Sequence, residues 1–166
     1  MSISNKPDEL IYSFAPIANL ECKILILGTV PGKESLRQNA YYAHPQNGFW
    51  KIIFQLHHIP YSTDINARNS VLLQNRIALW DVLKVCRRKS SLDSHIRDEV
   101  PNDLQKFLHQ HPNIQAIFFN GKSAATYFKK YFPDIGLPTY VLPSTSPANA
   151  IRMEQKVAAW EILKTF

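Results

Sequence analysis

The sequence predicts a three-layer α/β/α fold around a short, mainly parallel sheet of four strands. Short apolar runs alternate along the chain with longer segments in which apolar residues recur at helical spacing. Strands that alternate with helices favour a parallel sheet, because the helices cover both of its faces and bury the strands between them. Turn-forming residues close several of the runs, which places loops at their carboxyl ends.

Four strands are expected in chain order. The first, KILIL at residues 23–27, is too short and too rich in branched side chains for a lone helix. The second is IALWDVL at 77–83, which Asp81 interrupts near its end. The remaining two are IQAIFF at 114–119 and TYVL at 139–142.

Helices are expected between these strands. Asn47 is a candidate N-cap, since the apolar residues that follow it form a stripe at helical spacing. The complete set of expected helices covers residues 47–56, 68–75, 101–110, 122–131 and 151–164. The segments up to residue 21, from 57 to 66 and from 86 to 102 are expected to be lead-in, connecting or irregular segments.

Length and charge limit the classes of protein to which the chain can belong. With 166 residues, the chain suits one domain, residues 1–166, with a real hydrophobic core. The net charge of +6 favours a polyanionic partner, with nucleic acid as the first candidate. The Lys and Arg residues are scattered along the chain, with one local run at residues 87–89.

Cysteine usage and hydropathy indicate the compartment. Cys22 and Cys86 are far apart and match no metal-ligand spacing, so neither a metal nor an iron–sulfur cofactor is expected. No apolar run has the length of a membrane span, and the polar start MSISNKPDEL is not a signal peptide. A reducing, cytoplasmic location is therefore expected, away from membranes.

The stretch from Gly28 to Trp50 is the most informative part of the chain. Glycine and proline force a turn directly after the first strand, where open α/β sheets place their ligands. Two tyrosines, a histidine and an asparagine then crowd into residues 41–47. These residues fit either a loop packed on the core or a pocket with an aromatic floor and an amide aimed at a ligand. The second interpretation is favoured, because another polar, turn-rich stretch lies at residues 143–149.

Three loops are expected to meet at one rim of the sheet. Tyr42 and Asn47 follow the first strand, Asn120 ends the third, and residues 143–149 (PSTSPAN) follow the fourth. An aromatic face with two amides suits a planar heterocycle, and glycine and serine backbone amides suit phosphate. Each feature also has a structural explanation, since Asn120 could cap a helix and PSTSPAN could be a capped turn. Their conjunction predicts a base-binding pocket beside a nucleic-acid track.

Other catalytic motifs are absent or incomplete. The segment 28–33 is one residue short of a phosphate-binding GxxxxGK loop, and Glu34 stands where Ser or Thr is required. The ending at Gly121-Lys122-Ser123 lacks its earlier glycine. The chain contains neither a GxSxG elbow nor an HExxH zinc motif. His44 either braces the first loop or contacts a ligand.

Four motifs resemble one family. GTVPG at 28–32, YYAHPQNGFW at 41–50, FFNGKSA at 118–124 and LPSTSPANA at 142–150 resemble the uracil-DNA glycosylase superfamily, and in particular its hypoxanthine-DNA glycosylase branch. The resemblance extends over about residues 20–160. It implies a single uracil-DNA glycosylase-like domain.

The resemblance also implies roles for individual residues. In the wider superfamily the first loop supplies a catalytic Asp or Asn, and Val30 stands at that position here. Asn47 is then the implied catalytic residue, which positions the water or the sugar. Tyr42 matches the aromatic residue that stacks on the flipped base, and Asn120 matches the asparagine that reads the base edge. The remaining implied base-binding residues are Thr29, Val30 and His44.

The implied DNA contacts are on three loops. Residues 143–149 match the loop that pushes into the duplex when a nucleotide flips, and the uracil-specific histidine of this loop is missing. Contacts to phosphate are expected to make binding depend steeply on salt. The full implied DNA-binding set is Gly32, Gly121, Lys122, Ser123, Ser144, Thr145, Ser146, Pro147 and Asn149.

The implied activity is that of a monofunctional glycosylase with no cofactor and no metal. The enzyme would flip a deaminated base out of double-stranded or single-stranded DNA and hydrolyse its N-glycosidic bond, and a monomer is the default assembly. Two alternatives stay open at this point. One is a uracil- or mismatch-directed glycosylase of the same fold, and the other is an inert binder of damaged DNA, which Val30 would permit.

Overall fold

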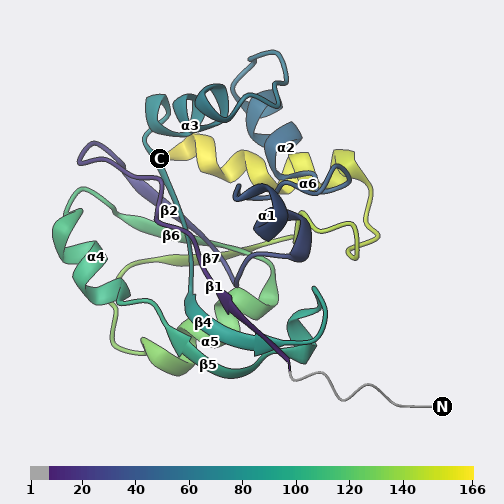
Figure 1. Cartoon of the computed structure of the whole chain (residues 1–166). Helices are drawn as coiled ribbons and strands as arrows, with labels where there is room; N and C mark the ends of the chain where they lie inside the picture. The colour runs from purple at the N-terminus through teal and green to yellow at the C-terminus, as the bar shows by residue number, and fades with distance from the viewer. Residues whose placement is uncertain (1–7) are drawn as a thin grey trace.

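A computed structural model describes residues 8–166 and contains two sheets (Figure 1). The larger sheet has four parallel strands in the order β3-β2-β6-β7. Its strands are β2 (Ile24–Gly28), β3 (Ile77–Asp81), β6 (Ala116–Asn120) and β7 (Thr139–Leu142). The predicted α/β class and the four predicted parallel strands are confirmed.

Burial explains why β2 lies in the middle of this sheet. All five of its residues are buried, and the side chains of the first four alternate between two hydrophobic clusters. Ile24 and Ile26 face a cluster that includes residues of α2, α3 and α6. Leu25 and Leu27 face a second cluster, which includes residues of α4, α5 and β4. The parallel sheet is therefore covered on both faces, as the continuous apolar runs predict (Figure 1).

The helices lie close to their expected positions, with shifted ends. They are α2 (Phe49–Leu56), α3 (Ile65–Gln74), α4 (Leu104–Gln110), α5 (Lys122–Tyr131) and α6 (Met153–Trp160), and a 3₁₀ segment, η2 (Glu161–Thr165), follows α6. Asp64 and Asp103 begin α3 and α4 by accepting hydrogen bonds from Ala67 N and Lys106 N, at 2.9 and 3.0 Å. Among the described residues, no helix is long and apolar enough to cross a membrane.

A second, antiparallel sheet was not expected from the sequence. It has the order β1-β4-β5, from β1 (Glu9–Tyr12), β4 (Leu83–Arg88) and β5 (Arg97–Pro101). The expectation of irregular structure at 86–102 was therefore wrong, and so was that of one strand over 77–83. Val82 lies between β3 and β4. Its N–H still donates to the Gly28 carbonyl of β2, at 2.8 Å, and beyond it the chain pairs with β1 and β5 instead.

Two short helical segments were also missed. They are α1 (Lys33–Gln38), which lies inside the stretch between Gly28 and Trp50, and η1 (Asp93–His95), which lies between β4 and β5.

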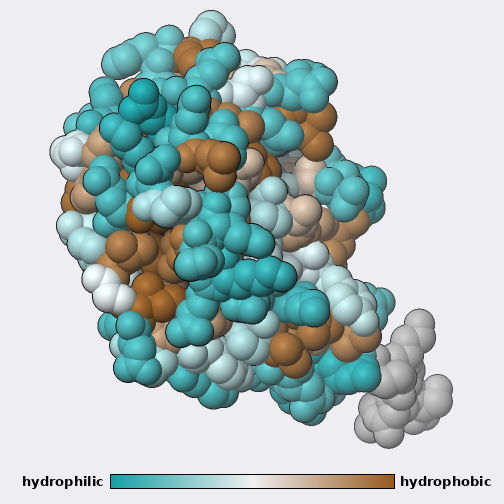
Figure 2. Space-filling view, turned by 90° about the vertical axis from the view of Figure 1, so that its left-hand side faces the viewer, coloured by the Kyte–Doolittle hydropathy of each residue, from teal (hydrophilic) through white to brown (hydrophobic). Residues whose placement is uncertain are grey.

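Figure 2 shows the surface of the molecule on the side of α4. Hydrophobic patches lie there between hydrophilic residues.

Candidate active site

A cavity of about 650 Å³ lies where the parallel strands end. The register of the sheet brings its walls together, because Gly28 is aligned with Asp81 and Asn120 with Leu142. Most of the predicted site residues line this one cavity. They are Thr29, Val30, Gly32, Tyr42, His44, Asn47, Asn120, Ser144, Thr145, Ser146, Pro147 and Asn149.

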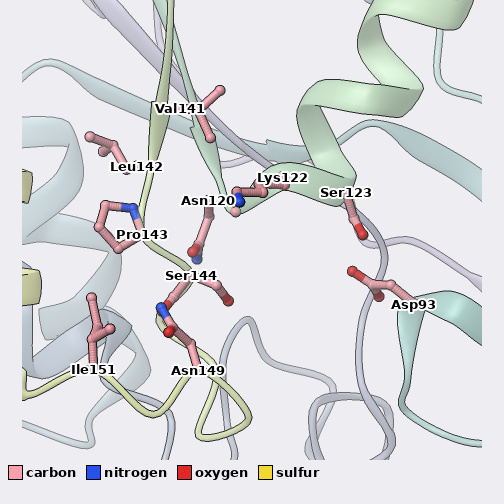
Figure 3. Close-up of a pocket in the computed structure, with 11 residues that line it drawn as sticks. Asp93, Asn120, Lys122, Ser123, Val141, Leu142, Pro143, Ser144, Asn149 and Ile151 are labelled. Atoms are coloured by element: carbon pink, nitrogen blue, oxygen red, sulfur yellow. The ribbon is translucent and has the colours of Figure 1, made fainter.

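The remaining predicted residues, Gly121, Lys122 and Ser123, line a neighbouring cavity of about 580 Å³ (Figure 3). The two cavities share Asp93, Asn120, Ser144 and Asn149 along their boundary. The three predicted loops therefore meet at one rim of the sheet, although the start of α5 faces the second cavity.

Tyr42 is held rigidly at the cavity wall. Its backbone has φ of 50°, a left-handed conformation that is rare outside glycine. Its ring stacks on Phe49 of α2, with centroids 4.2 Å apart and planes at 26°. Phe49 in turn meets the edge of Trp160 of α6, at 5.8 Å. This chain of aromatic contacts fixes the ring before any ligand arrives.

The hydroxyl of Tyr42 is buried, and it has no hydrogen-bond partner among residues 8–166. Burial raises the pKa of Tyr42, the nearby Asp81 carboxylate acts in the same direction, and the Asn120 amide acts in the opposite direction. An unpaired buried hydroxyl is costly, so its position at a cavity points to a polar ligand group or water.

Asn47 is oriented by hydrogen bonds on both sides. Its N–H donates to the carbonyl of His44, at 2.9 Å, and its side-chain oxygen accepts from Phe49 N, at 3.0 Å. Helix α2 begins at Phe49 with Gly48 at the N-cap, so the predicted capping role of Asn47 is only partly right. An amide oxygen carries two lone pairs, so the second lone pair and the side-chain NH₂ group stay available at the cavity.

His44 is exposed at the cavity rim and braces the first loop. Its Nδ1 accepts from Gln46 N at 3.1 Å, in addition to the bond between its carbonyl and Asn47 N. Of the two roles expected for His44, loop bracing is present in the structure, and contact to a ligand stays a prediction.

Asn120 is tied to the PSTSPAN loop. Its Oδ1 accepts from Thr145 N and its Nδ2 donates to Thr145 Oγ1, both at 2.9 Å. It does not cap α5, whose N-cap position is taken by Gly121. The Asn120 amide also lies near enough to the Tyr42 hydroxyl to lower the pKa of Tyr42. Reading of the base by Asn120 stays a prediction.

Helix α6 braces the same loop from behind. Trp160 Nε1 donates to the Pro143 carbonyl at 2.9 Å, and Lys156 Nζ donates to the Ser146 carbonyl at 3.2 Å. Lys156 is only 4% exposed, and burial lowers the pKa of its ammonium group. Gly48 N also donates to the Thr145 carbonyl, at 3.0 Å, which joins this loop to the one that carries Asn47.

Sequence reasoning missed several charged residues of the site, of which three interact with one another, namely Asp81, Asp93 and Arg88. Asp81 lines the cavity and is 4% exposed. Asp93 lies between the two cavities, and Figure 3 shows its carboxylate facing Ser123. Arg88 is 2% exposed and donates to the Pro31 carbonyl at 2.6 Å, beneath the first loop.

These three charges influence one another. Burial raises the pKa of Asp81 to about 7, with a smaller contribution from Asp93, and Arg88 acts in the opposite direction. Burial also raises the pKa of Asp93, while the hydroxyls of Thr29 and Ser123 oppose that shift. The one available sequence signal was a carboxylate inside the apolar run LWDVL.

Val30 lies at the cavity and packs against the second hydrophobic cluster, so this position of the first loop supplies no polar side chain. Within residues 8–166, no three His, Cys, Asp or Glu side chains are grouped as a metal site would require.

Comparisons with known proteins identify the family of this chain. The sequence model described as the uracil DNA glycosylase superfamily matches residues 15–165. Two relatives named hypoxanthine DNA glycosylase come from Methanosarcina barkeri and Methanosarcina acetivorans. The first is 34% identical over 89% of this chain and 93% of its own length, and the second is 35% identical over 89% and 94%.

A solved structure has the same fold. The solution structure of a candidate uracil DNA glycosylase from Methanosarcina acetivorans superimposes with a TM-score of 0.80 and 32% identity. The match covers 94% of this chain and 99% of that one. With a family match over most of its length and relatives above 30% identity, the chain belongs to the uracil DNA glycosylase superfamily.

Proposed function

We propose that this protein is a monofunctional DNA glycosylase that removes hypoxanthine from deoxyinosine and leaves an abasic site. The observation that carries the proposal is the single cavity that gathers a rigid aromatic ring, Tyr42, and the oriented amide of Asn47. Two relatives that carry the name hypoxanthine DNA glycosylase support the choice of base.

The cavity suits a base that has left the duplex. Its volume of about 650 Å³ falls in the range of small-molecule sites, and the ring of Tyr42 offers a stacking surface for a flipped base. Deoxyinosine pairs weakly, so extracting it costs less than extracting a normal base, which adds selectivity. The net charge of +6 attracts the phosphate backbone.

Cleavage of the bond between C1′ and N9 sends the bonding electron pair to the base, while positive charge develops on the sugar. Asn47 would hold the attacking water or the sugar through the free lone pair or the NH₂ group of its amide. Backbone groups of Thr29 and Val30 would stabilise the departing base. Water adds to C1′ and loses a proton, and no lysine Schiff base is required.

Single-turnover excision tests the proposal on duplexes that carry inosine, uracil, xanthine or a G·T mismatch, with alkali cleavage as the readout. We expect cutting chiefly at inosine. Preferential cutting at uracil or at the mismatch would overturn the proposed specificity while leaving a glycosylase. Tight binding of the inosine duplex without any alkali-labile product would instead indicate an inert binder of damaged DNA.

A further inference from the structure

Asp81 lies at the inner end of the cavity, and its carboxylate has no hydrogen bond or ion pair within residues 8–166. The residue is 4% exposed, and only its backbone carbonyl is bonded, by Asn102 Nδ2 at 2.8 Å. Buried carboxylates are normally paired or hydrogen-bonded, because burial of an unpaired charge is costly. An unpaired one that lines a cavity is therefore a candidate to contact the ligand.

The sheet register places this carboxylate beside Tyr42. Gly28 and Asp81 are aligned across β2 and β3. A methyl group added to Gly28 would lie 2.5 Å from Asp81 Oδ1 and 2.6 Å from the Tyr42 hydroxyl oxygen, so both oxygens converge on Gly28. Asp81 is therefore at the hydroxyl end of the Tyr42 ring. A base stacked on that ring would turn an edge toward Asp81.

The charges around Asp81 come from several elements. Asp93 of η1 opposes ionisation of Asp81, and Arg88 of β4 favours it. The Tyr42 hydroxyl faces it from the first loop, and Lys33 and Glu34 of α1 line the same cavity. Desolvation is the largest influence, so the pKa of Asp81 rises to about 7 and the neutral acid is well populated near neutral pH.

We propose that Asp81 is the general acid of the reaction, which donates a proton to N7 of the flipped purine. This inference rests on the proposed function and deepens it. N7 carries a lone pair and belongs to the same five-membered ring as N9, on which negative charge builds as the C1′–N9 bond breaks. Proton transfer from Asp81 lets the base leave neutral. The proton that water releases at C1′ then returns the carboxylate to its acid form.

The same proton donor would favour purine substrates. Uracil offers no comparable nitrogen, because its N1 is bonded to the sugar and its N3 already carries a proton. A carboxylic acid at this position therefore adds rate to hypoxanthine and other purine lesions but not to uracil. The substrate class of the cavity is then a deaminated purine.

The test compares single-turnover excision of hypoxanthine by the wild type and Asp81→Asn between about pH 5.5 and about pH 8.5. Asparagine has nearly the same shape and no ionisable proton. We expect the wild-type rate to fall as pH rises above neutrality. The variant should be slower by roughly 10²–10⁴-fold at the acidic end and should lack this fall.

A matched control is Asp98→Asn, which removes the same charge from an exposed residue of β5 and should keep the wild-type rate and profile. Equal rates and profiles for Asp81→Asn and the wild type would overturn the proposal. A slower Asp81→Asn that keeps the wild-type fall with pH would also overturn it, because the role would then be structural. If the wild type excises none of the four test bases, the proposed function itself fails.

Discussion

At the scale of single residues, the cavity is assembled before any ligand is present. Tyr42 keeps a left-handed backbone, and its ring is stacked on Phe49, which the edge of Trp160 supports. Strained backbone positions persist only where the surroundings hold them in place. The ring is therefore a preorganised platform, and a stacked base would lose little binding energy to ordering it.

Loss of the Tyr42 ring should lower the affinity for DNA that carries the lesion. Tyr42→Ala is expected to reduce binding of an inosine duplex by about 1–3 kcal/mol, the usual contribution of one stacked base. Fluorescence titration of inosine and undamaged duplexes measures it, with Tyr12→Ala on exposed β1 as the control. An equal loss for both duplexes would show a general defect rather than lost stacking.

Gly28 has no room for a side chain. In Gly28→Ala, the new methyl group would lie 2.5 Å from Asp81 Oδ1 and 2.6 Å from the Tyr42 hydroxyl, so these side chains would have to shift. We expect destabilisation of about 1–3 kcal/mol, measured by denaturant unfolding, together with loss of excision. The control is Gly136→Ala, where an added methyl group meets no atom within 4 Å. Wild-type excision by Gly28→Ala would contradict this view of the cavity floor.

Sequence motifs could identify the residues of the loops but not the charges beneath them. Tyr42, Asn47, Asn120 and PSTSPAN follow strand ends in the sequence, so a parallel sheet necessarily brings them to one rim. The proximity of Asp81 to Gly28 depends instead on the pairing of β2 with β3, which lie far apart in the chain. Arginine is usually a surface residue, so the sequence alone does not indicate that tertiary contacts bury Arg88.

At the scale of elements, β6 and the loop at 143–149 behave as one unit. Asn120 at the end of β6 bonds the backbone and the side chain of Thr145, which is 1% exposed. The loop is further held by Trp160 and Lys156 of α6. The loop that is predicted to enter the duplex is thus anchored to the sheet and to a helix.

Removing this anchor should destabilise the protein. Asn120→Ala leaves the buried Thr145 N–H and hydroxyl without partners, so we expect a loss of about 1–3 kcal/mol in the free energy of unfolding. Urea unfolding followed by circular dichroism measures it. Asn66→Ala on the exposed side of α3 is the matched control, with a change within about 0.5 kcal/mol. Equal stability of the two variants would show that Asn120 does not anchor the loop.

The strands of the parallel sheet could be predicted from the sequence, whereas those of the second sheet could not. The runs that form β2, β6 and β7 are apolar or closed by turn residues, so local sequence determines them. Strands β1 and β5 are mostly exposed, β5 is rich in charge, and β1 pairs with β4, which lies far along the chain. Their pairing depends on tertiary contacts, which a local sequence pattern cannot predict.

At the scale of the whole molecule, the free energy of unfolding should depend on pH because of the buried Asp81. The folded-state pKa is raised from 3.8 to about 7, so between these values the unfolded chain loses this proton while the folded protein keeps it. The folded state then binds more protons, and the free energy of unfolding falls as pH rises through this window. The stabilising contribution is complete below the lower value and lost above the higher one.

Asp81→Asn should abolish this contribution to the pH dependence. We expect the variant to gain stability relative to the wild type at pH 8, and the gain should shrink toward pH 4, where both side chains are neutral. Urea unfolding at the two pH values measures the difference, with Asp98→Asn as the exposed control. A difference that does not change with pH would contradict the burial of an ionisable Asp81.

The most direct test of the proposed catalytic role of Asn47 is single-turnover excision of hypoxanthine from an inosine duplex by Asn47→Ala and by the wild type, with binding measured in parallel. Because the Asn47 side chain is oriented by Phe49 N and keeps an oxygen lone pair and its NH₂ group for a ligand, we expect a loss of at least about 100-fold in rate with binding largely intact. A wild-type excision rate in Asn47→Ala would contradict the assignment of this cavity as the place where the N-glycosidic bond is cut.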